Sequence, residues 1–410
     1  MIASISKLME DRNLDLLWLS GASNECPEIY YLTGGVSLTA AWILVRPGKR
    51  PLLVHGPMER EAAAASGCAT IDFSALDREK IARHENDPLA VSLEMFVRLA
   101  EREALGGRMA MHGLADPGET HHLLKAIEQR LPQIQVVRDV PPVMESSRAT
   151  KDDAELEAMR AVAEDSLACI QTALDTIRAC HERDGIVITA DGEPLTVGRV
   201  KSLLRSKMAG RNLLETHETI LGQGREAGVP HASSDNNEPL QTGVATVFDV
   251  FPCRGGGGYF FDITRSFTIG RPDPEFEKLY KQVYDVQQLA IERAAAGVHG
   301  SELQKLACDE FERQGHATVL GTPATRSGYV HSLGHGIGLE VHEAPFLRLQ
   351  EKPDERNCLI PGSVFTIEPG LYYPQRGQGV RIEDVVYIDE DGTAKVLAPF
   401  AKFSVLELEG

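Results

Sequence analysis

Residues 244–269 read VATVFDVFPCRGGGGYFFDITRSFTI, and this stretch decides the fold of the C-terminal part of the chain. Two apolar, β-prone runs flank the glycines Gly255 to Gly258, which predicts a hairpin with a loose turn. If the strands fold about the 255/256 midpoint, Asp249 lies opposite Asp262. The hairpin then presents two carboxylates on one face.

A second stretch of the same construction occupies residues 364–388, VFTIEPGLYYPQRGQGVRIEDVVYI. A fold about its 375/376 midpoint sets Glu368 opposite Glu383. Facing residues of an antiparallel pair have Cβ atoms about 4.5–5.5 Å apart, and like charges there are destabilising. Acids among Val, Phe, Ile and Tyr also bear a desolvation cost. A divalent cation between the acids relieves both penalties, whereas the alternatives are a solvent-facing pair or a shared proton.

The segment HSLGHGIGLEVHEAP, residues 331–345, supplies His331, His335 and His342 among glycines that exclude an ordinary helix. Its spacing is neither that of a H-E-x-x-H metal motif nor that of a phosphate-binding loop. A single histidine is more often structural than a ligand, but three beside two acid pairs favour a functional site. One imidazole with four carboxylates forms a hard ligand set that suits Mn²⁺, Co²⁺, Fe²⁺ or Zn²⁺. Four carboxylates also balance two divalent ions about 3.5–4 Å apart.

Composition limits the class of protein. At 410 residues the chain is long enough for two domains, and its formal net charge of -18 would repel nucleic acid and anionic membrane surfaces. We expect no secretion signal, because the N-terminus lacks a basic start, and no spanning helix, because no apolar run reaches ~20 residues. Seven scattered cysteines without C-x-x-C spacing indicate reduced thiols. These features predict a cytoplasmic protein without nucleic-acid or membrane partners.

Short apolar runs alternate with helical stretches up to about residue 140, which predicts an α/β domain over residues 1–150. The predicted strands are 16–19, 42–45, 52–54, 109–111 and 134–137. Two prolines then end the pattern, and ESSRATKDDAE (145–155) predicts a polar hinge with a helix start at Asp152 or Asp153. Helical spacing predicts further helices up to 177, over 275–296 and over 301–314, the last capped by Ser301.

These residues resemble the pita-bread metallopeptidases, which comprise Xaa-Pro dipeptidases (prolidases), aminopeptidase P, methionyl aminopeptidases and creatinases. The resemblance rests on the first carboxylate hairpin, on GHGIG followed by VHEAP, on TIEPGLYY and on GVRIED, with YYLTGG in the N-terminal part. It implies an α+β protein. A C-terminal pita-bread domain over residues 151–410 would follow a smaller α/β creatinase/prolidase-type N-terminal domain over residues 1–150.

The resemblance also assigns site residues by motif. It implies that two metal ions are held by Asp249, Asp262, His335, Glu368 and Glu383. His231 in GVPHASSD and His342 in VHEAP match substrate-side histidines, and Arg381 matches a residue that orders the site. Glu368 matches the residue that takes the proton of the attacking water. The stretch between the two aspartates is two residues longer than in the typical family hairpin.

The resemblance implies dinuclear-metal hydrolysis of a peptide bond near the N-terminus of short peptides, with Xaa-Pro dipeptides or Xaa-Pro peptides as substrates. Mn²⁺ is the expected metal, with Co²⁺, Fe²⁺ or Zn²⁺ as alternatives, and a homodimer is the expected state. Two other interpretations stay open. One is a non-peptidase enzyme on the same scaffold, such as a small amide hydrolase or a lyase. The other is a catalytically silent binding module, although such modules typically lose ligands or add basic segments.

Overall fold

The computed structural model describes residues 2–113, 116–352 and 354–409. The chain divides into two compact units, of which the first comprises residues 1–147 together with 256–258. The second comprises residues 148–255 and 259–410. The chain passes between the units at Ser147 and Arg148, close to the 150/151 boundary expected from the sequence.

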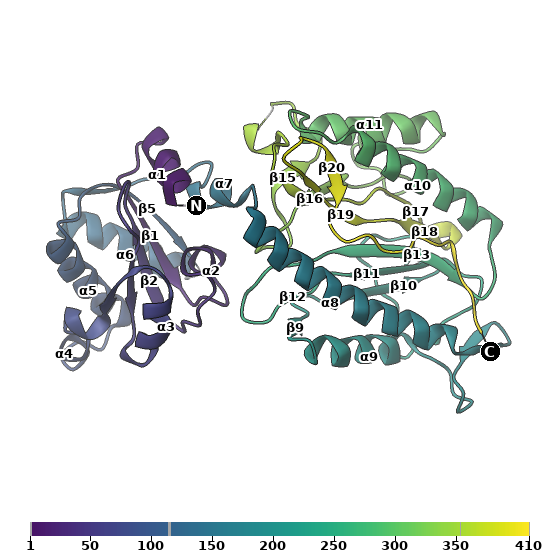
Figure 1. Ribbon diagram of the computed structural model, residues 1–410, viewed down its shortest axis with the longest axis horizontal. Coiled ribbons are helices and arrows are strands. Elements are labelled where there is room, and N and C mark those ends of the chain that lie inside the picture. Colours follow the sequence, from purple (N-terminus) through teal and green to yellow (C-terminus); the bar gives the residue numbers. More distant parts are fainter. Residues whose placement is uncertain (1, 114–115, 353, 410) are drawn as a thin grey trace. The chain divides into compact units, whose positions relative to one another are not determined.

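A mixed sheet forms the centre of the first unit (Figure 1). Its strands are β1 (Leu16–Gly21), β2 (Ala41–Val45), β3 (Leu52–His55), β4 (Ala69–Asp72), β5 (Gly107–Gly113) and β6 (Ile134–Val136). Within the described residues the strand order is β4-β3-β2-β1-β5-β6, with β1, β5 and β6 mutually parallel and β2 antiparallel to its neighbours. The five predicted strands are confirmed. The prediction omitted β4, which is four residues long and has one buried residue.

Helices pack on this sheet and complete its core. They are α1 (Ile2–Asp11), α2 (Pro27–Thr33), α3 (Arg60–Ala65), α4 (Arg78–Ala82), α5 (Pro88–Glu103) and α6 (Pro117–Arg130), with short 3-10 turns η1 (Pro57–Glu59) and η2 (Phe73–Leu76). The helix α7 (Val143–Arg148) ends at the first residue of the second unit. The rings of Trp18 and Trp42 lie 5.2 Å apart, and the ring of Phe96 lies 4.5 Å from that of Trp18. Both tryptophans of the chain therefore belong to the core of the first unit.

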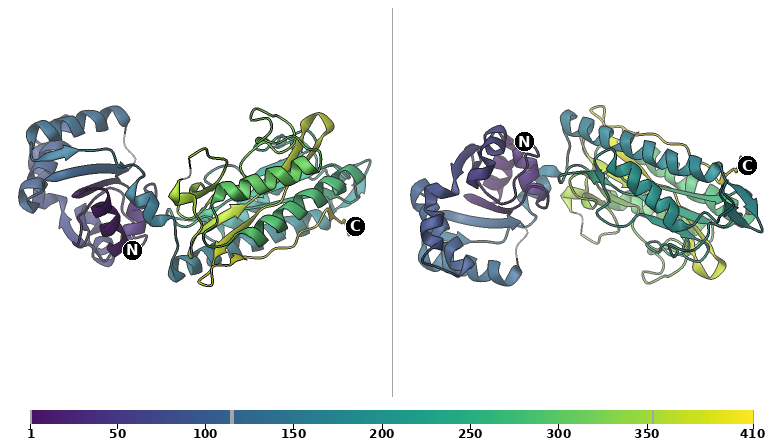
Figure 2. Two further views of the ribbon diagram at one scale, coloured as in Figure 1. Left: turned by 90° about the horizontal axis from the view of Figure 1, so that it is seen from above. Right: turned by 90° about the horizontal axis from the view of Figure 1, so that it is seen from below.

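The second unit places its sheets between two pairs of helices (Figures 1 and 2). The helices α8 (Asp153–Arg178) and α9 (Val197–Ala209) share one apolar core with the strands, and α10 (Pro274–Arg293) and α11 (Gly300–Arg313) share another on the opposite side. The predicted start of α8 is confirmed, since Asp152 is its N-cap. The predicted end of α10 at 296 is three residues too far, and α9 was not predicted.

The N-cap of α11 is His299, so the prediction that Ser301 caps this helix is wrong. The His299 side chain accepts a hydrogen bond from the Ser301 backbone, while the Glu302 side chain returns to the His299 N–H. The physical reason is a capping box in which an imidazole nitrogen takes the place of the usual hydroxyl or carboxylate oxygen.

Short strands make up the sheets of the second unit. They are β7 (His181–Arg183), β8 (Ile186–Ile188), β9 (Leu213–Leu214), β10 (Ile220–Gln223), β11 (Thr246–Val250), β12 (Cys253–Arg254), β13 (Ile263–Ile269), β14 (Gly334–Gly336), β15 (Glu343–Leu347), β16 (Val364–Ile367), β17 (Gly370–Tyr373), β18 (Gln378–Arg381), β19 (Asp384–Ile388), β20 (Ala394–Val396) and β21 (Val405–Leu406). Over the described residues, the larger sheets have the orders β10-β11-β13-β21 and β15-β14-β16-β19-β20. Smaller pairs are β17-β18, β9-β12 and β7-β8, and the 3-10 turns are η3 (Glu355–Asn357) and η4 (Pro374–Arg376).

The first hairpin differs in register from the prediction. Asp249 on β11 lies opposite Thr264 on β13, so the prediction that it lies opposite Asp262 is wrong. A bridge between Cys253 and Phe260 continues the observed register towards the tip. The chain therefore turns between residues 256 and 257, where both glycines have φ near +90° (93° and 91°), a conformation that favours glycine. Because side chains alternate along a strand, an offset of two residues keeps both carboxylates on one face.

The second hairpin has the predicted register. Ile367 on β16 pairs with Asp384 on β19, and Gly370 on β17 pairs with Arg381 on β18. Glu368 and Glu383 lie between these two paired segments, in the same register. The prediction that they face each other is confirmed.

None of the helices in the described residues combines the length and the apolar character needed to cross a membrane. All seven cysteines are free thiols, and all are buried except Cys358, which is partly exposed.

We expect Asp152→Ala to destabilise the second unit by about 1 kcal/mol, because the Asp152 side chain caps the backbone N–H of Glu155. Urea unfolding followed by far-UV circular dichroism should show the loss, while tryptophan fluorescence, which reports only the first unit, should not shift. The matched control is Asp153→Ala, which removes an acid from the first turn of α8 without removing a cap. Equal effects of the two substitutions would contradict the capping role.

Candidate metal centre

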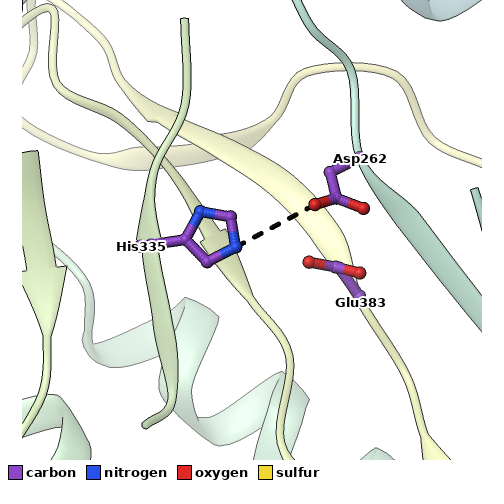
Figure 3. A group of neighbouring side chains, drawn as sticks. All are labelled: Asp262, His335 and Glu383. Carbon is purple, nitrogen blue, oxygen red and sulfur yellow. Dashed lines mark ion pairs between the residues drawn. The ribbon is translucent and has the colours of Figure 1, made fainter. Parts of the chain in front are cut away.

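Three side chains from separate strands point toward one another in the second unit (Figure 3). Asp262 immediately precedes β13, His335 lies on β14, and Glu383 immediately precedes β19. Each offers a ligand atom within 4.8 Å of the others, and all three residues are buried. The Nε2 atom of His335 lies 3.9 Å from Oδ2 of Asp262. The fold thus brings together three of the five predicted ligands directly.

Glu368 lies at the edge of this group. Its Oε1 atom is 3.5 Å from Nε2 of His335, and 16% of its side chain is exposed, against 7% for Asp262. Glu368 follows β16 and precedes β17, so it sits where the two paired segments of the hairpin join. It is therefore the carboxylate of the group that solvent or a small molecule reaches most easily.

Asp249, the fifth predicted ligand, is held by an arginine. Its Oδ2 atom accepts a hydrogen bond of 2.6 Å from Nη2 of Arg381, whereas its Oδ1 atom is buried without a hydrogen-bond partner. Oδ1 of Asp262 is also buried and unpartnered. Buried carboxylate oxygens without partners are rare in native proteins and call for an explanation. Divalent cations fit these residues, because carboxylate oxygens are the hard donor atoms that such cations prefer. A bound cation would give both unpartnered oxygens a partner.

The carboxylates raise one another's pKa. Burial, followed by the charges of Glu383 and Asp249, raises the pKa of Asp262 well above its ordinary range. Burial and the charge of Glu383 likewise raise the pKa of Glu368. Burial and the charge of Asp249 raise the pKa of Glu383 to about 8. Without a cation the cluster therefore retains protons near neutral pH.

His335 is held as a neutral imidazole. Its Nδ1 atom lies 3.1 Å from the carbonyl oxygen of Gly336, which directs the lone pair of Nε2 toward the carboxylates. Burial, followed by the charge of His342, lowers the pKa of His335 to about 3. Close backbone packing requires the flanking glycines, because a Cβ atom on Gly334 would lie 2.0 Å from the carbonyl oxygen of Thr366.

Arg381 connects the parts of the site. Besides Asp249, it donates to Oγ1 of Thr264 at 3.0 Å, to the hydroxyl of Tyr372 at 2.9 Å and to the carbonyl of Pro230 at 3.0 Å. Thr264 in turn donates to Oε2 of Glu383 at 2.7 Å. Sequence reasoning missed Thr264 and Tyr372. Thr264 could have been identified from its position two residues after Asp262, because this spacing puts both side chains on one face of a strand.

Arg265 supports the site through the backbone of Glu383. Its guanidinium donates to the backbone carbonyl of Glu383 at 2.6 Å and to Oδ1 of Asp384 at 2.7 Å, and all three residues are buried. These contacts fix the backbone that carries Glu383. Sequence reasoning missed Arg265 as well, because a basic residue next to a predicted site gives no indication of the side to which it points.

Histidines form the accessible side of the centre. The ring of His342 contacts that of His335 edge to face, with centroids 4.2 Å apart. Burial, followed by the charges of His231 and His217, lowers the pKa of His342, so both of these histidines lie within electrostatic range of His342. His231 is exposed and follows Pro230, whose carbonyl binds Arg381. His217 was not predicted, and its surroundings in ETHETI contain no motif that could have identified it.

Comparison with known proteins assigns the class of protein that this fold and site define. The sequence model described as metallopeptidase family M24 matches residues 157–390, which is more than half of the chain. The chain belongs to metallopeptidase family M24. The predicted class, a peptidase that depends on divalent metal ions, is confirmed.

Named relatives cover different shares of the chain. The Xaa-Pro dipeptidase of Pyrococcus furiosus is 24% identical over 396 residues, which are 96% of this chain and 97% of that protein. A probable dipeptidase of Mycobacterium tuberculosis is 32% identical over 230 residues, which are 55% of this chain and 57% of that protein. A solved prolidase from Pyrococcus horikoshii aligns with a TM-score of 0.73 at 24% identity, covering 98% of both chains. The predicted pita-bread fold is confirmed.

We expect the metal-free protein to lose stability as the pH rises toward 9. A carboxyl group whose pKa is about 8 in the folded protein stabilises it fully below the unfolded pKa of about 4.3, and this contribution is lost as the pH rises through 8. Melting temperatures of chelator-treated protein between pH 5 and pH 9 would measure this loss.

The matched control for this pH dependence is Glu383→Gln, which is neutral throughout that range. The melting temperature of the variant should rise relative to the parent with increasing pH, by about 2–4 °C for each kcal/mol. Parallel curves for parent and variant would show that the crowding of the carboxylates does not affect stability.

Proposed function

We propose that this chain is a dipeptidase that hydrolyses Xaa-Pro dipeptides with two divalent metal ions. The metals would be held by Asp249, Asp262, His335, Glu368 and Glu383. The observation that carries the proposal is the convergence of Asp262, His335 and Glu383 on one buried point. Two relatives that align with nearly the whole chain are Xaa-Pro dipeptidases, which supports the substrate.

The residues of the site suit amide hydrolysis. Bound metal ions would polarise the scissile carbonyl and lower the pKa of the attacking water. Glu368, the accessible carboxylate, would take a proton from that water on a carboxylate oxygen and deliver it to the leaving nitrogen. The imidazole of His342 would donate a hydrogen bond to the developing oxyanion.

Arg381 and His231 complete the proposed roles. Arg381 keeps Asp249 oriented, because its guanidinium is itself fixed by Thr264, Tyr372 and the carbonyl of Pro230. Since His231 directly follows that proline, the same contact holds its segment beside the centre, where its imidazole would bind the substrate.

The proposal includes Mn²⁺ as the native metal and a homodimer as the native state. Oxygen-rich donor sets accept Mn²⁺, but Co²⁺, Fe²⁺ and Zn²⁺ also bind carboxylates and imidazole, so the donor set alone does not choose among them. The homodimer and a cytoplasmic location follow from the resemblance and the composition described above.

We expect metal-reconstituted protein to hydrolyse Ala-Pro faster than Ala-Ala or Ala-Pro-Ala. The experiment is to remove metal with a chelator, restore Mn²⁺, Co²⁺, Fe²⁺ or Zn²⁺ separately, and measure kcat/KM for each peptide. Faster cleavage of Ala-Ala would overturn the selectivity for proline. Cleavage of none of the peptides by protein that binds two metal ions would favour a non-peptidase enzyme on this scaffold.

The substitution Glu368→Gln should lower kcat about 10²–10⁴-fold, because glutamine cannot accept the proton of the attacking water. Metal analysis of the same protein should show that both ions remain bound. The control is Glu193→Gln, which makes the same chemical change at an exposed position outside the centre. Normal turnover by Glu368→Gln would exclude Glu368 as the proton carrier.

A further inference from the structure

Two basic residues of the predicted polar hinge are buried. Arg148 is 3% exposed and Lys151 is 5% exposed. Nζ of Lys151 donates to Oε1 of Glu343 at 2.6 Å, and Nη1 of Arg148 lies 3.9 Å from Oε2 of the same carboxylate. Arg148 also forms an ion pair with Glu340. The hinge prediction is therefore wrong for these two side chains, which belong to the interior of the second unit.

The surrounding backbone leaves space for this ion cluster. A Cβ atom on Gly338 would lie 2.4 Å from Oε1 of Glu343 and 2.8 Å from Cε of Lys151. The last glycine of GHGIG therefore leaves the space that the ion pair fills. The backbone N–H of Lys151 donates to the carbonyl of Gly362 at 2.8 Å, which fixes the segment from a second side. Buried charges are costly unless they are paired in good geometry, and here they are.

The ion cluster holds the turn that carries His342 on both sides of this residue. Glu343 follows His342 directly, and Glu340 precedes it by two residues. Among the described residues, no hydrogen bond fixes the imidazole of His342 itself, whose contact is with the ring of His335. The position of this imidazole thus depends on the His335 ring and on the backbone of residues 340–343, which the two ion pairs hold near its ends.

We propose that Arg148 and Lys151 are positioning residues that hold His342 at the substrate side of the centre through their ion pairs with Glu340 and Glu343. The proposal rests on the function proposed above, because it depends on His342 acting in the transition state. A cluster that only stabilises the fold would have the same contacts, so the test must separate the two roles.

The test is a double-mutant cycle. The pair Lys151→Met with Glu343→Gln removes both charges together and so avoids leaving one buried charge alone. We expect it to lower kcat for Ala-Pro about tenfold with little change in KM, a loss within the usual range for coupled residues. In a His342→Ala background the same pair should cause no further loss, since the group being positioned is absent. Equal losses in both backgrounds, or no loss in either, would overturn the proposal.

Hydrogen exchange provides a readout that does not depend on activity. Amide exchange of residues 339–347 should become faster in the Lys151→Met and Glu343→Gln pair, and unchanged exchange would overturn the proposal. A parent protein that cleaves no Xaa-Pro peptide would refute the proposed function instead, and exchange alone would then decide whether the ion pairs hold the turn.

Two further variants keep the test informative. Glu340→Gln breaks a partly exposed contact of Arg148 and spares the buried pair, so it serves if the double variant does not fold. It should give a smaller loss of kcat that again vanishes in the His342→Ala background; persistence there would overturn the proposal. The matched control, Lys305→Met with Asp309→Asn, removes an exposed ion pair on α11 and should change neither kcat nor exchange.

Discussion

Mutual repulsion among buried carboxylates is the constraint on which the second unit depends. Asp249, Asp262, Glu368 and Glu383 reach one region of the interior from four strand ends, and their charges oppose one another. Arg381 supplies a buried positive charge, and further compensation must come from protons or cations. This repulsion explains the role of the hydrogen bonds of Thr264, Arg265 and Tyr372. They keep groups that repel each other in fixed positions.

Much of the site could be predicted because its residues lie on regular hairpins. The second hairpin has a turn with one glycine in the left-handed conformation, Gly377, and its register followed from counting residues. The first hairpin has four consecutive glycines, each able to take up positive φ. No property of the sequence selects which pair of them forms the turn, so the predicted register was off by two residues.

Contacts between distant segments account for the rest. The segment ESSRATKDDAE has the composition of an exposed linker, yet its one arginine and its one lysine are buried. Lys151 and Glu343 are 192 residues apart in the chain, and no local pattern reveals such a pairing. The same holds for His217, which approaches the centre only because β10 pairs with β11 beside Asp249. Periodicity identified the elements, whereas these side chains acquired their roles from tertiary packing.

The even offset of the first hairpin has a consequence for how such proteins can change over evolutionary time. A strand repeats every two residues, so one residue added at the tip would turn Asp249 or Asp262 away from the other proposed metal ligands. Two added residues leave both carboxylates in place and alter only the glycine tip. Lengths at this tip should therefore vary in steps of two among proteins that keep the ligand set, and an odd difference would mark a lineage that has lost the centre or acquired a compensating bulge.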